Sequence, residues 1–180
     1  WTKIFGLSAF ALRLPSLLFV TAAALLPLIW RAPGLSRAAT LCWAALILLW
    51  GPGFDLAADA RGYGLLLLLS TAQALAFMHL MHRPDVQRAT LWAGLGSLSG
   101  LTHYHALLLA GVQGLAFLAV HRGQALRCWP AALAFIPAFG WLAIHAPRLT
   151  DYARPDVAWY EAMTPTLAGD FIQFAFGLSG

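Results

Sequence analysis

The sequence has few charged residues for its length. Asp, Glu, Lys and Arg make up 10% of the 180 residues, hydrophobic residues make up 61%, and the mean hydropathy is +0.73. Because soluble domains carry about 25% charged residues, this composition argues against an ordinary soluble domain and indicates a protein that lies in a bilayer. The chain also lacks a stripe of basic residues, and we therefore expect no nucleic acid among its partners.

Cysteines are also scarce, and the sequence shows no internal repeat at a fixed period. The two cysteines, Cys42 and Cys128, fall inside or at the ends of apolar segments. A free thiol in such a position behaves as a small hydrophobic group. We therefore expect both to be packing residues and not part of a disulfide framework or a metal site.

The apolar segments that are present approach the length needed to cross a membrane, about 20 residues per helix. They cover residues 14–30, 38–54, 62–81, 88–102, 104–120 and 128–146, and a seventh begins near 166 and is cut off by the end of the chain. Segments of this kind, without alternating polarity, must satisfy their backbone groups as helices. The sequence predicts one all-α transmembrane domain over residues 1–180, a polytopic helix bundle with about six full spans plus a truncated seventh.

The charges in the loops predict the orientation of the bundle. The segments "RAPGLSR", "HRPDVQR" and "HRGQALR" each carry two arginines, and alternate crossings bring all three to the same face. That face is expected to be cytoplasmic, because cytoplasmic loops retain basic residues. Asp85 then lies inside, and the other acidic residues lie outside, namely Asp55, Asp59, Asp151, Asp156, Glu161 and Asp170.

A group of polar residues lies where the chain re-enters the membrane from outside. In a helix, Asp55, Asp59 and Tyr63 would share one face, and Arg61 would keep a nearby carboxylate ionised and suit a phosphate. Ionisable groups at a membrane boundary are by default functional. A helix cap explains Asp55 better. For Asp59, Arg61 and Tyr63 we favour a functional role over capping and contact with lipid head groups.

A second polar group, in "GLTHYHALLLA", occupies the outer turn between the segments 88–102 and 104–120. His103 and His105 are two residues apart and do not share a face of a helix, so the pair is a weak signal for a metal site. One of the two rings can still reach inward. For His105 we favour an interfacial role, which amphipathic His and Tyr side chains commonly fill.

Three short motifs, taken in order, resemble a family. "FALRLPSLLFV", "ADARGYGLLLLLS" and "GLTHYHALLL" look like the polytopic glycosyltransferases of the GT-C type that use polyprenyl-phosphate-linked sugars. This group includes protein mannosyltransferases and the aminoarabinose transferase of lipid A. The resemblance extends from about residue 5 to about residue 145, and lies in the order of the motifs more than in any one of them.

The resemblance implies a multi-pass enzyme of the bacterial cytoplasmic (inner) membrane, with its active face outside the cytoplasm. Such an enzyme moves a sugar from a polyprenyl-phosphate donor to a lipid, glycan or protein acceptor, in contact with membrane lipids. The family's acidic-Ala-Arg-x-Tyr signature corresponds to Asp59, Arg61 and Tyr63, with Asp59 where the acid is commonly Glu. Its Thr-His-Tyr signature corresponds to Thr102 and the two residues after it.

The resemblance also implies roles for these residues. Asp59 would be catalytic and, together with His103, would hold a divalent cation, Mg or Mn, beside the carrier phosphate. The substrate would be bound by Arg61, Tyr63, His103 and Tyr104. The family's main catalytic aspartate would precede residue 1, in a first outer loop after a first helix. The chain is therefore expected to be a fragment that is inactive alone.

Two other functions remain open. A transporter or flippase for a lipid-linked or anionic substrate would use broken helices, which Pro27, Pro130 and Pro137 would supply. The sequence shows neither the inverted repeat nor the midplane charge that such proteins carry. A non-catalytic membrane scaffold would bind lipid through its outer loop, and substitutions at Asp59 or Arg61 would then affect only stability.

Overall fold

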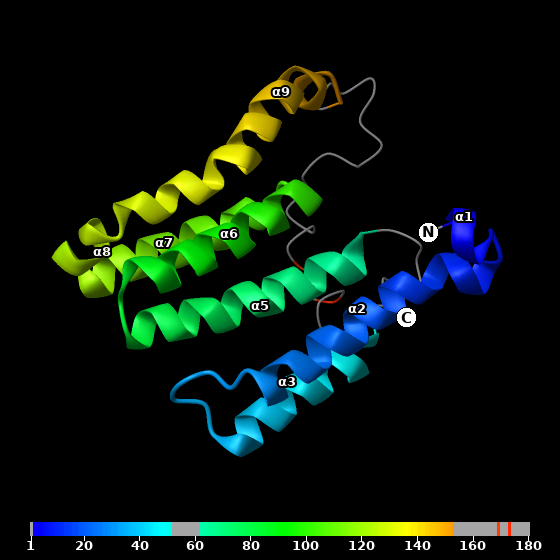
Figure 1. Ribbon diagram of the computed structural model, residues 1–180, viewed down its shortest axis with the longest axis horizontal. Coiled ribbons are helices and arrows are strands. Elements are labelled where there is room, and N and C mark those ends of the chain that lie inside the picture. Colours follow the sequence, from blue (N-terminus) through cyan, green and yellow to red (C-terminus); the bar gives the residue numbers. More distant parts are fainter. Residues whose placement is uncertain (1, 52–61, 153–168, 170–172, 174–180) are drawn as a thin grey trace.

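The computed structural model describes residues 2–51, 62–152, 169 and 173, and within these residues the chain forms helices and no strand (Figure 1). The all-helical prediction is confirmed for this part of the chain. Asp59 and Arg61 lie outside the described residues, and of the predicted seventh span only residues 169 and 173 are described.

The helices are named by their labels in Figure 1. In chain order they are α1 (Thr2–Phe5), α2 (Ala9–Ile29), α3 (Arg37–Leu49), α5 (Tyr63–His82), α6 (Val86–Thr102), α7 (Ala106–His121), α8 (Gly123–Arg127), the 3₁₀ helix η1 (Trp129–Phe135) and α9 (Ile136–Tyr152). Hydroxyl caps begin two of them. Ser8 Oγ accepts from the backbone N–H of Ala11 at the start of α2, and Ser36 Oγ accepts from Ala39 at the start of α3.

Three helical segments of the described chain are long and apolar enough to cross a membrane. They are Ala9–Ile29, Tyr63–His82 and Trp129–Arg148, and the last combines η1 with most of α9. Each of the six spans predicted between residues 14 and 146 overlaps a helix, but the prediction of six full membrane crossings is not confirmed. The apolar helices Arg37–Leu49 and Ala106–His121 are shorter. At 13 residues, α3 extends only about 20 Å along its axis, against a hydrocarbon core of about 30 Å.

The helix α6 lies at the centre of the fold. It packs against α5, α7, η1 and α9, while α5 also packs against α2, and α2 against α3 (Figure 1). Small residues permit this close packing. A Cβ added to Gly96 would lie 3.0 Å from Cε1 of Phe135, and one added to Gly100 would lie 2.6 Å from Cδ2 of Leu107.

The antiparallel order of the helices gives the bundle two distinct ends. We call one the arginine end, where α2, α5 and α7 finish and the turns contain Arg31, Arg83 and Arg122. We call the other the histidine end, where α5 begins at Tyr63 and the turn 103–105 joins α6 to α7 (Figure 1). The largest apolar core lies toward the arginine end, around Leu80, Trp92, Phe117 and Cys128. Cys128 is therefore a packing residue as predicted, whereas Cys42 is exposed on α3.

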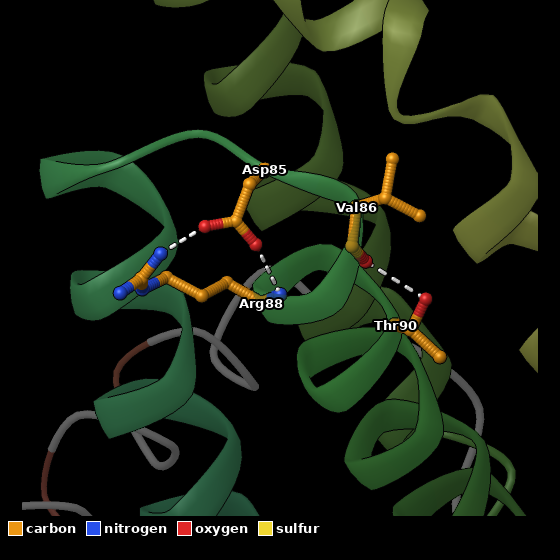
Figure 2. Close-up of polar contacts among 4 residues, drawn as sticks. All are labelled: Asp85, Val86, Arg88 and Thr90. Carbon is orange, nitrogen blue, oxygen red and sulfur yellow. Dashed lines mark hydrogen bonds and ion pairs between the residues drawn. The ribbon is translucent and has the colours of Figure 1, made fainter.

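The acidic residue predicted to lie among the arginines begins α6. Asp85 Oδ1 accepts from the backbone N–H of Arg88 at 2.8 Å, and its other oxygen pairs with the guanidinium of the same residue (Figure 2). One turn further, Thr90 Oγ1 donates to the carbonyl of Val86. The hydrogen bond from the Arg88 backbone, aided by the nearby guanidinium charge, lowers the pKa of Asp85. Asp85 therefore acts as a helix cap at the arginine end.

Candidate functional site

The histidine end brings two separate motifs together. Gly62 and Tyr63 begin α5, while Thr102 ends α6, and a Cβ built on Gly62 would lie 3.5 Å from Cγ2 of Thr102. His103 follows in an extended conformation, and its backbone N–H still donates to the carbonyl of Ser99 at 2.8 Å. The ring centroids of Tyr63 and His103 are 6.4 Å apart. The structure thus brings these two predicted substrate-binding residues close together.

A cavity of about 180 Å³ lies between the two motifs, lined by Gly62, Tyr63, Leu66, Thr102 and His103. Since one water occupies about 30 Å³ of liquid, this is room for a few waters or for one small polar group. The cavity adjoins the residue from which the chain continues back toward Arg61 and Asp59. Those two predicted site residues lie outside the described residues, so the structure assigns them no position.

The imidazole of His103 is less basic than usual. Burial lowers its pKa below the usual value of 6.5, and the nearby His105 lowers this pKa further because two positive charges would repel each other. At neutral pH the ring is therefore uncharged. A neutral imidazole offers a nitrogen lone pair to a metal ion or a proton, and it does not supply a positive charge to a phosphate.

The turn between α6 and α7 also gathers a second histidine. Nδ1 of His105 lies 3.3 Å from Nδ1 of His103, and the ring centroids are 5.0 Å apart. The backbone N–H groups of Ala106 and Leu108 donate to the carbonyls of His103 and His105, and these two bonds hold the turn. His105 is exposed, while His103 is partly buried beside the cavity.

The structure shows that a turn, and not one face of a helix, brings these two histidines together. The argument from helical periodicity assumed that both rings project from one helix, but His103 has φ −153° and ψ 116°, which is extended backbone. His105 has φ −61° and ψ −22°, so the chain changes conformation between the two histidines. The break between the predicted spans 88–102 and 104–120 was the signal that could have identified the pair.

Tyr104 lies next to the cavity and does not line it. Its side chain is 43% exposed, and its ring packs 4.3 Å from that of His105 and 5.4 Å from that of His103, measured between centroids. Of the predicted substrate-binding residues in the described chain, the structure thus brings Tyr63 and His103 to one cavity, with Tyr104 on its outer side.

A larger cavity of about 1050 Å³ extends along α6. Its lining begins at Gln87 and Arg88, near the arginine end, and reaches Leu101, two residues before His103. Most of the lining side chains are apolar, and one wall holds Trp30, whose ring stacks on that of His79 at 5.2 Å. Gln87 and Leu101 are 14 positions apart, or about 21 Å along a helix.

Three helices share a buried polar network that the sequence did not reveal. The side-chain oxygen of Gln113 accepts from Gln73 Nε2 at 2.9 Å and from Trp92 Nε1 at 2.8 Å. These residues belong to α7, α5 and α6, and Gln73 is fully buried. Isolated glutamines in apolar segments carry no periodic signal, so only the packing of the three helices could identify their contact.

Among the described residues, no three His, Cys, Asp or Glu side chains gather at one point where they could hold a metal ion. The predicted Mg or Mn pair of Asp59 and His103 extends beyond the described residues, because Asp59 is not among them. Comparisons of this chain with models of known protein families, with curated proteins and with solved structures find no match.

Proposed function

We propose that the protein is a membrane glycosyltransferase that moves a sugar from a polyprenyl-phosphate carrier to an acceptor on the extracytoplasmic side. The observation that carries this proposal is the cavity shared by Tyr63 and His103. These residues come from the two signatures by which the sequence resembles the GT-C-type transferases, and they are 40 positions apart in the chain. Their common cavity is what a substrate site built from both signatures requires.

The large cavity along α6 supports the same function. A polyprenyl carrier has a long hydrocarbon tail, and a mostly apolar cavity that ends near Leu101, close to the histidine end, suits such a tail. The tail would then remain in the hydrocarbon region while its phosphate and sugar reach Tyr63 and His103. This arrangement explains why the reacting groups are at a boundary of the membrane and not in a soluble domain.

The chemistry requires stabilisation of a departing phosphate. Cleavage of the bond between sugar and phosphate builds negative charge on the carrier. Fixed cationic groups lower the barrier because they stabilise this charge more strongly in the transition state than in the bound substrate. Because His103 is uncharged at neutral pH, the positive charge would come from Arg61 or from a cation near Asp59. Tyr63 and Tyr104 would contact the sugar or the phosphate through their hydroxyl groups.

The proposal is tested by Asp59→Asn in the natural protein that contains this chain. Membranes would be supplied with a labelled polyprenyl-phosphate sugar, and the transfer of the label would be measured. Loss of one preorganised electrostatic contact typically reduces turnover by about 10²- to 10³-fold, and we expect a decrease of that order. Asp151→Asn, at the end of α9, is the matched control and should retain the activity of the unmodified protein.

Two outcomes would contradict the proposal. If Asp59→Asn transferred sugar at the unmodified rate, Asp59 would have no role in the mechanism. If the unmodified protein bound the carrier and transferred no sugar from it, the transporter or scaffold function would be favoured instead. No described residue favours either, since the buried polar side chains of α5 and α7 are the uncharged Thr71, Gln73 and Gln113.

A further inference from the structure

We propose that the large cavity along α6 binds an anionic phospholipid, with its phosphate at the arginine end and one acyl chain along the helix. The polar residues Gln87, Arg88 and Thr90 line the cavity near that end. Leucines line it further along α6, namely Leu91, Leu95, Leu98 and Leu101. This order, from polar to apolar, matches a lipid whose head group stays at the membrane boundary. The inference does not depend on the transferase function.

One side of the cavity is open to the surroundings of the bundle. Leu91 is 48% exposed, Leu98 is 51% exposed and Leu101 is 38% exposed, although all three line the cavity. The rest of the lining includes His79 of α5 and Pro137 of α9. In a bilayer the open side would face lipid, so an acyl chain can enter sideways without separating the helices.

The arginine end carries the charge that selects an anionic head group. The described turns at this end contain one acidic residue, Asp85, and six arginines, namely Arg31, Arg37, Arg83, Arg88, Arg122 and Arg127. Asp85 pairs with Arg88, and the other five leave a positive balance. Because lipid tails are as apolar as leucine, an acyl chain alone gains little by entering such a cavity. The head group therefore determines which lipid binds, and basic pockets between membrane helices bind anionic head groups.

A buried nitrogen near this end has no hydrogen-bond partner in the described part of the chain. It is Nε2 of His79, which lines the cavity and stacks on Trp30 one turn before α5 ends. The ester oxygens of a phospholipid follow its phosphate and can accept a hydrogen bond from this ring. Ser97 Oγ is also unpaired, but a serine hydroxyl can turn to a carbonyl of its own helix, as Ser99 does. The histidine therefore favours a phospholipid over a bare hydrocarbon chain.

The phospholipid and the proposed sugar carrier would approach the cavity from opposite ends. The phosphate of the carrier belongs with Tyr63 and His103 at the histidine end, whereas Arg88 lines the cavity at the arginine end. The phospholipid is therefore a second ligand and not the sugar donor.

The test measures lipid binding to the purified protein in a nonionic detergent. Phosphatidylglycerol with brominated acyl chains would be titrated, and quenching of tryptophan fluorescence would report a chain beside Trp30. Phosphatidylcholine with the same chains is the neutral comparison. We expect saturable binding of one phosphatidylglycerol per chain, and Trp30→Phe should remove the saturable quenching. Since one basic residue contributes about fivefold to the binding of anionic lipid, phosphatidylglycerol should bind at least about fivefold more tightly than phosphatidylcholine.

Two variants test the head group and the chain separately. Arg88→Gln keeps the backbone N–H that Asp85 caps, so the variant should fold, bind phosphatidylglycerol about fivefold more weakly and bind phosphatidylcholine as before. Gly94→Leu should remove the saturable binding of both lipids. Gly94 lines the cavity and a Cβ added to it meets nothing within 4 Å, so the new side chain would occupy the space of the acyl chain.

Each variant has a matched control. Arg148→Gln removes an exposed arginine from α9, away from the arginine end. Gly111→Leu adds the same side chain to α7, where an added Cβ also meets nothing within 4 Å and where no residue lines the cavity. Both controls should bind phosphatidylglycerol as the unmodified protein does.

The proposal is overturned if the two lipids bind with equal affinity, since the cavity would then hold lipid without selecting its charge. It is also overturned if Gly94→Leu binds phosphatidylglycerol as tightly as the unmodified protein, because the lipid would then only cover the outer surface. Inorganic phosphate carries the charge without a chain, and its displacement of phosphatidylglycerol at similar concentrations would assign the site to a free anion. Sugar transfer is not measured, so failure of this site is distinguishable from failure of the transferase function.

Discussion

At the scale of single residues, two polar side chains in turns determine the local structure at the two ends of the bundle. Asp85 caps α6 at the arginine end, and His103 ends the same helix at the histidine end in an extended conformation. Both lie just outside regular helix, where backbone donors or acceptors lack partners within the helix. Their effects are therefore local and can be tested by single substitutions.

The cap at Asp85 makes a prediction that depends on pH. Since its pKa is lower in the folded protein than in the unfolded one, its contribution to stability is present above the unfolded value of 3.8. This contribution is lost as the pH falls through the folded pKa. Asp85→Ala should lower the melting temperature at pH 7. Below about pH 3.8, the difference in melting temperature between this variant and the unmodified protein should become smaller.

Asp85→Asn separates the cap from the charge. Asparagine caps helices about as well as aspartate, so this variant should remain more stable than Asp85→Ala at pH 7, while it loses the pH dependence that belongs to the carboxylate. Thermal unfolding in detergent, followed by circular dichroism, measures both effects. Equal melting temperatures for the Ala and Asn variants would show that the hydrogen bond to the Arg88 backbone does not stabilise α6.

At the scale of helices, α2 and α5 approach each other closely beside the candidate site. A Cβ added to Gly64 would lie only 2.8 Å from the carbonyl oxygen of Ser16 and 3.1 Å from its Cα. Both are backbone atoms, which cannot rotate away as the end of a side chain can. Since Gly64 directly follows Tyr63, this contact also determines where the start of α5 lies beside the cavity.

Gly64→Ala should therefore force α2 and α5 apart. Overpacking of this kind costs about 1–3 kcal/mol, and the accompanying shift of Tyr63 should alter the cavity it shares with His103. The matched control is Gly111→Ala in α7, where an added Cβ meets nothing within 4 Å. Because alanine favours helix over glycine by about 0.5–1 kcal/mol, the control should be as stable as the unmodified protein or more so.

The comparison can be made by denaturant unfolding in detergent. The expected order of stability is Gly111→Ala, the unmodified protein and Gly64→Ala, from highest to lowest. If Gly64→Ala were as stable as Gly111→Ala, the two helices would not approach as closely as the structure indicates. The sequence could suggest such sites only in general, because small residues in apolar segments favour close packing without specifying which helix is the neighbour.

At the scale of the whole molecule, one buried network joins α5, α6 and α7. Gln113 accepts hydrogen bonds from both Gln73 and Trp92, and its removal would leave two buried donors unpaired. An unpaired buried donor costs about 1–3 kcal/mol, although hydrogen bonds between membrane helices average only about 0.6 kcal/mol in measured cycles. We therefore expect Gln113→Leu to destabilise the fold by about 1–3 kcal/mol in total.

The control for this prediction is Gln124→Leu, at an exposed position of α8, which should change stability by less than about 0.5 kcal/mol. The double variant Gln73→Leu with Gln113→Leu should recover part of the loss, because it removes one of the two unpaired donors. An additive loss in the double variant would contradict the network, since contacting residues are expected to couple.

The local features of the fold were predictable from the sequence. Composition indicated a membrane protein, and apolar segments located the helices. The six full crossings are not confirmed, because three of the predicted spans correspond to helices of only 13 to 17 residues. Hydropathy averages over a segment do not determine where a helix begins and ends.

The candidate site was predictable only in part. The order of the motifs predicted Tyr63 and His103 as site residues, and both line one cavity. His105 was assigned an interfacial role. His105 is exposed and does not line that cavity, and its interfacial role stays a prediction.

The sequence by itself determined that this protein is helical, apolar and suited to a membrane, because these properties follow from composition and from interactions between near neighbours in the chain. Only the tertiary structure decided which polar side chains meet. The contact of Tyr63 with His103 depends on the packing of α5 against α6, and the convergence of His103 and His105 depends on the dihedral angles of one turn. The first is a contact between distant segments and the second depends on the backbone conformation of a turn, and hydrophobic patterns encode neither.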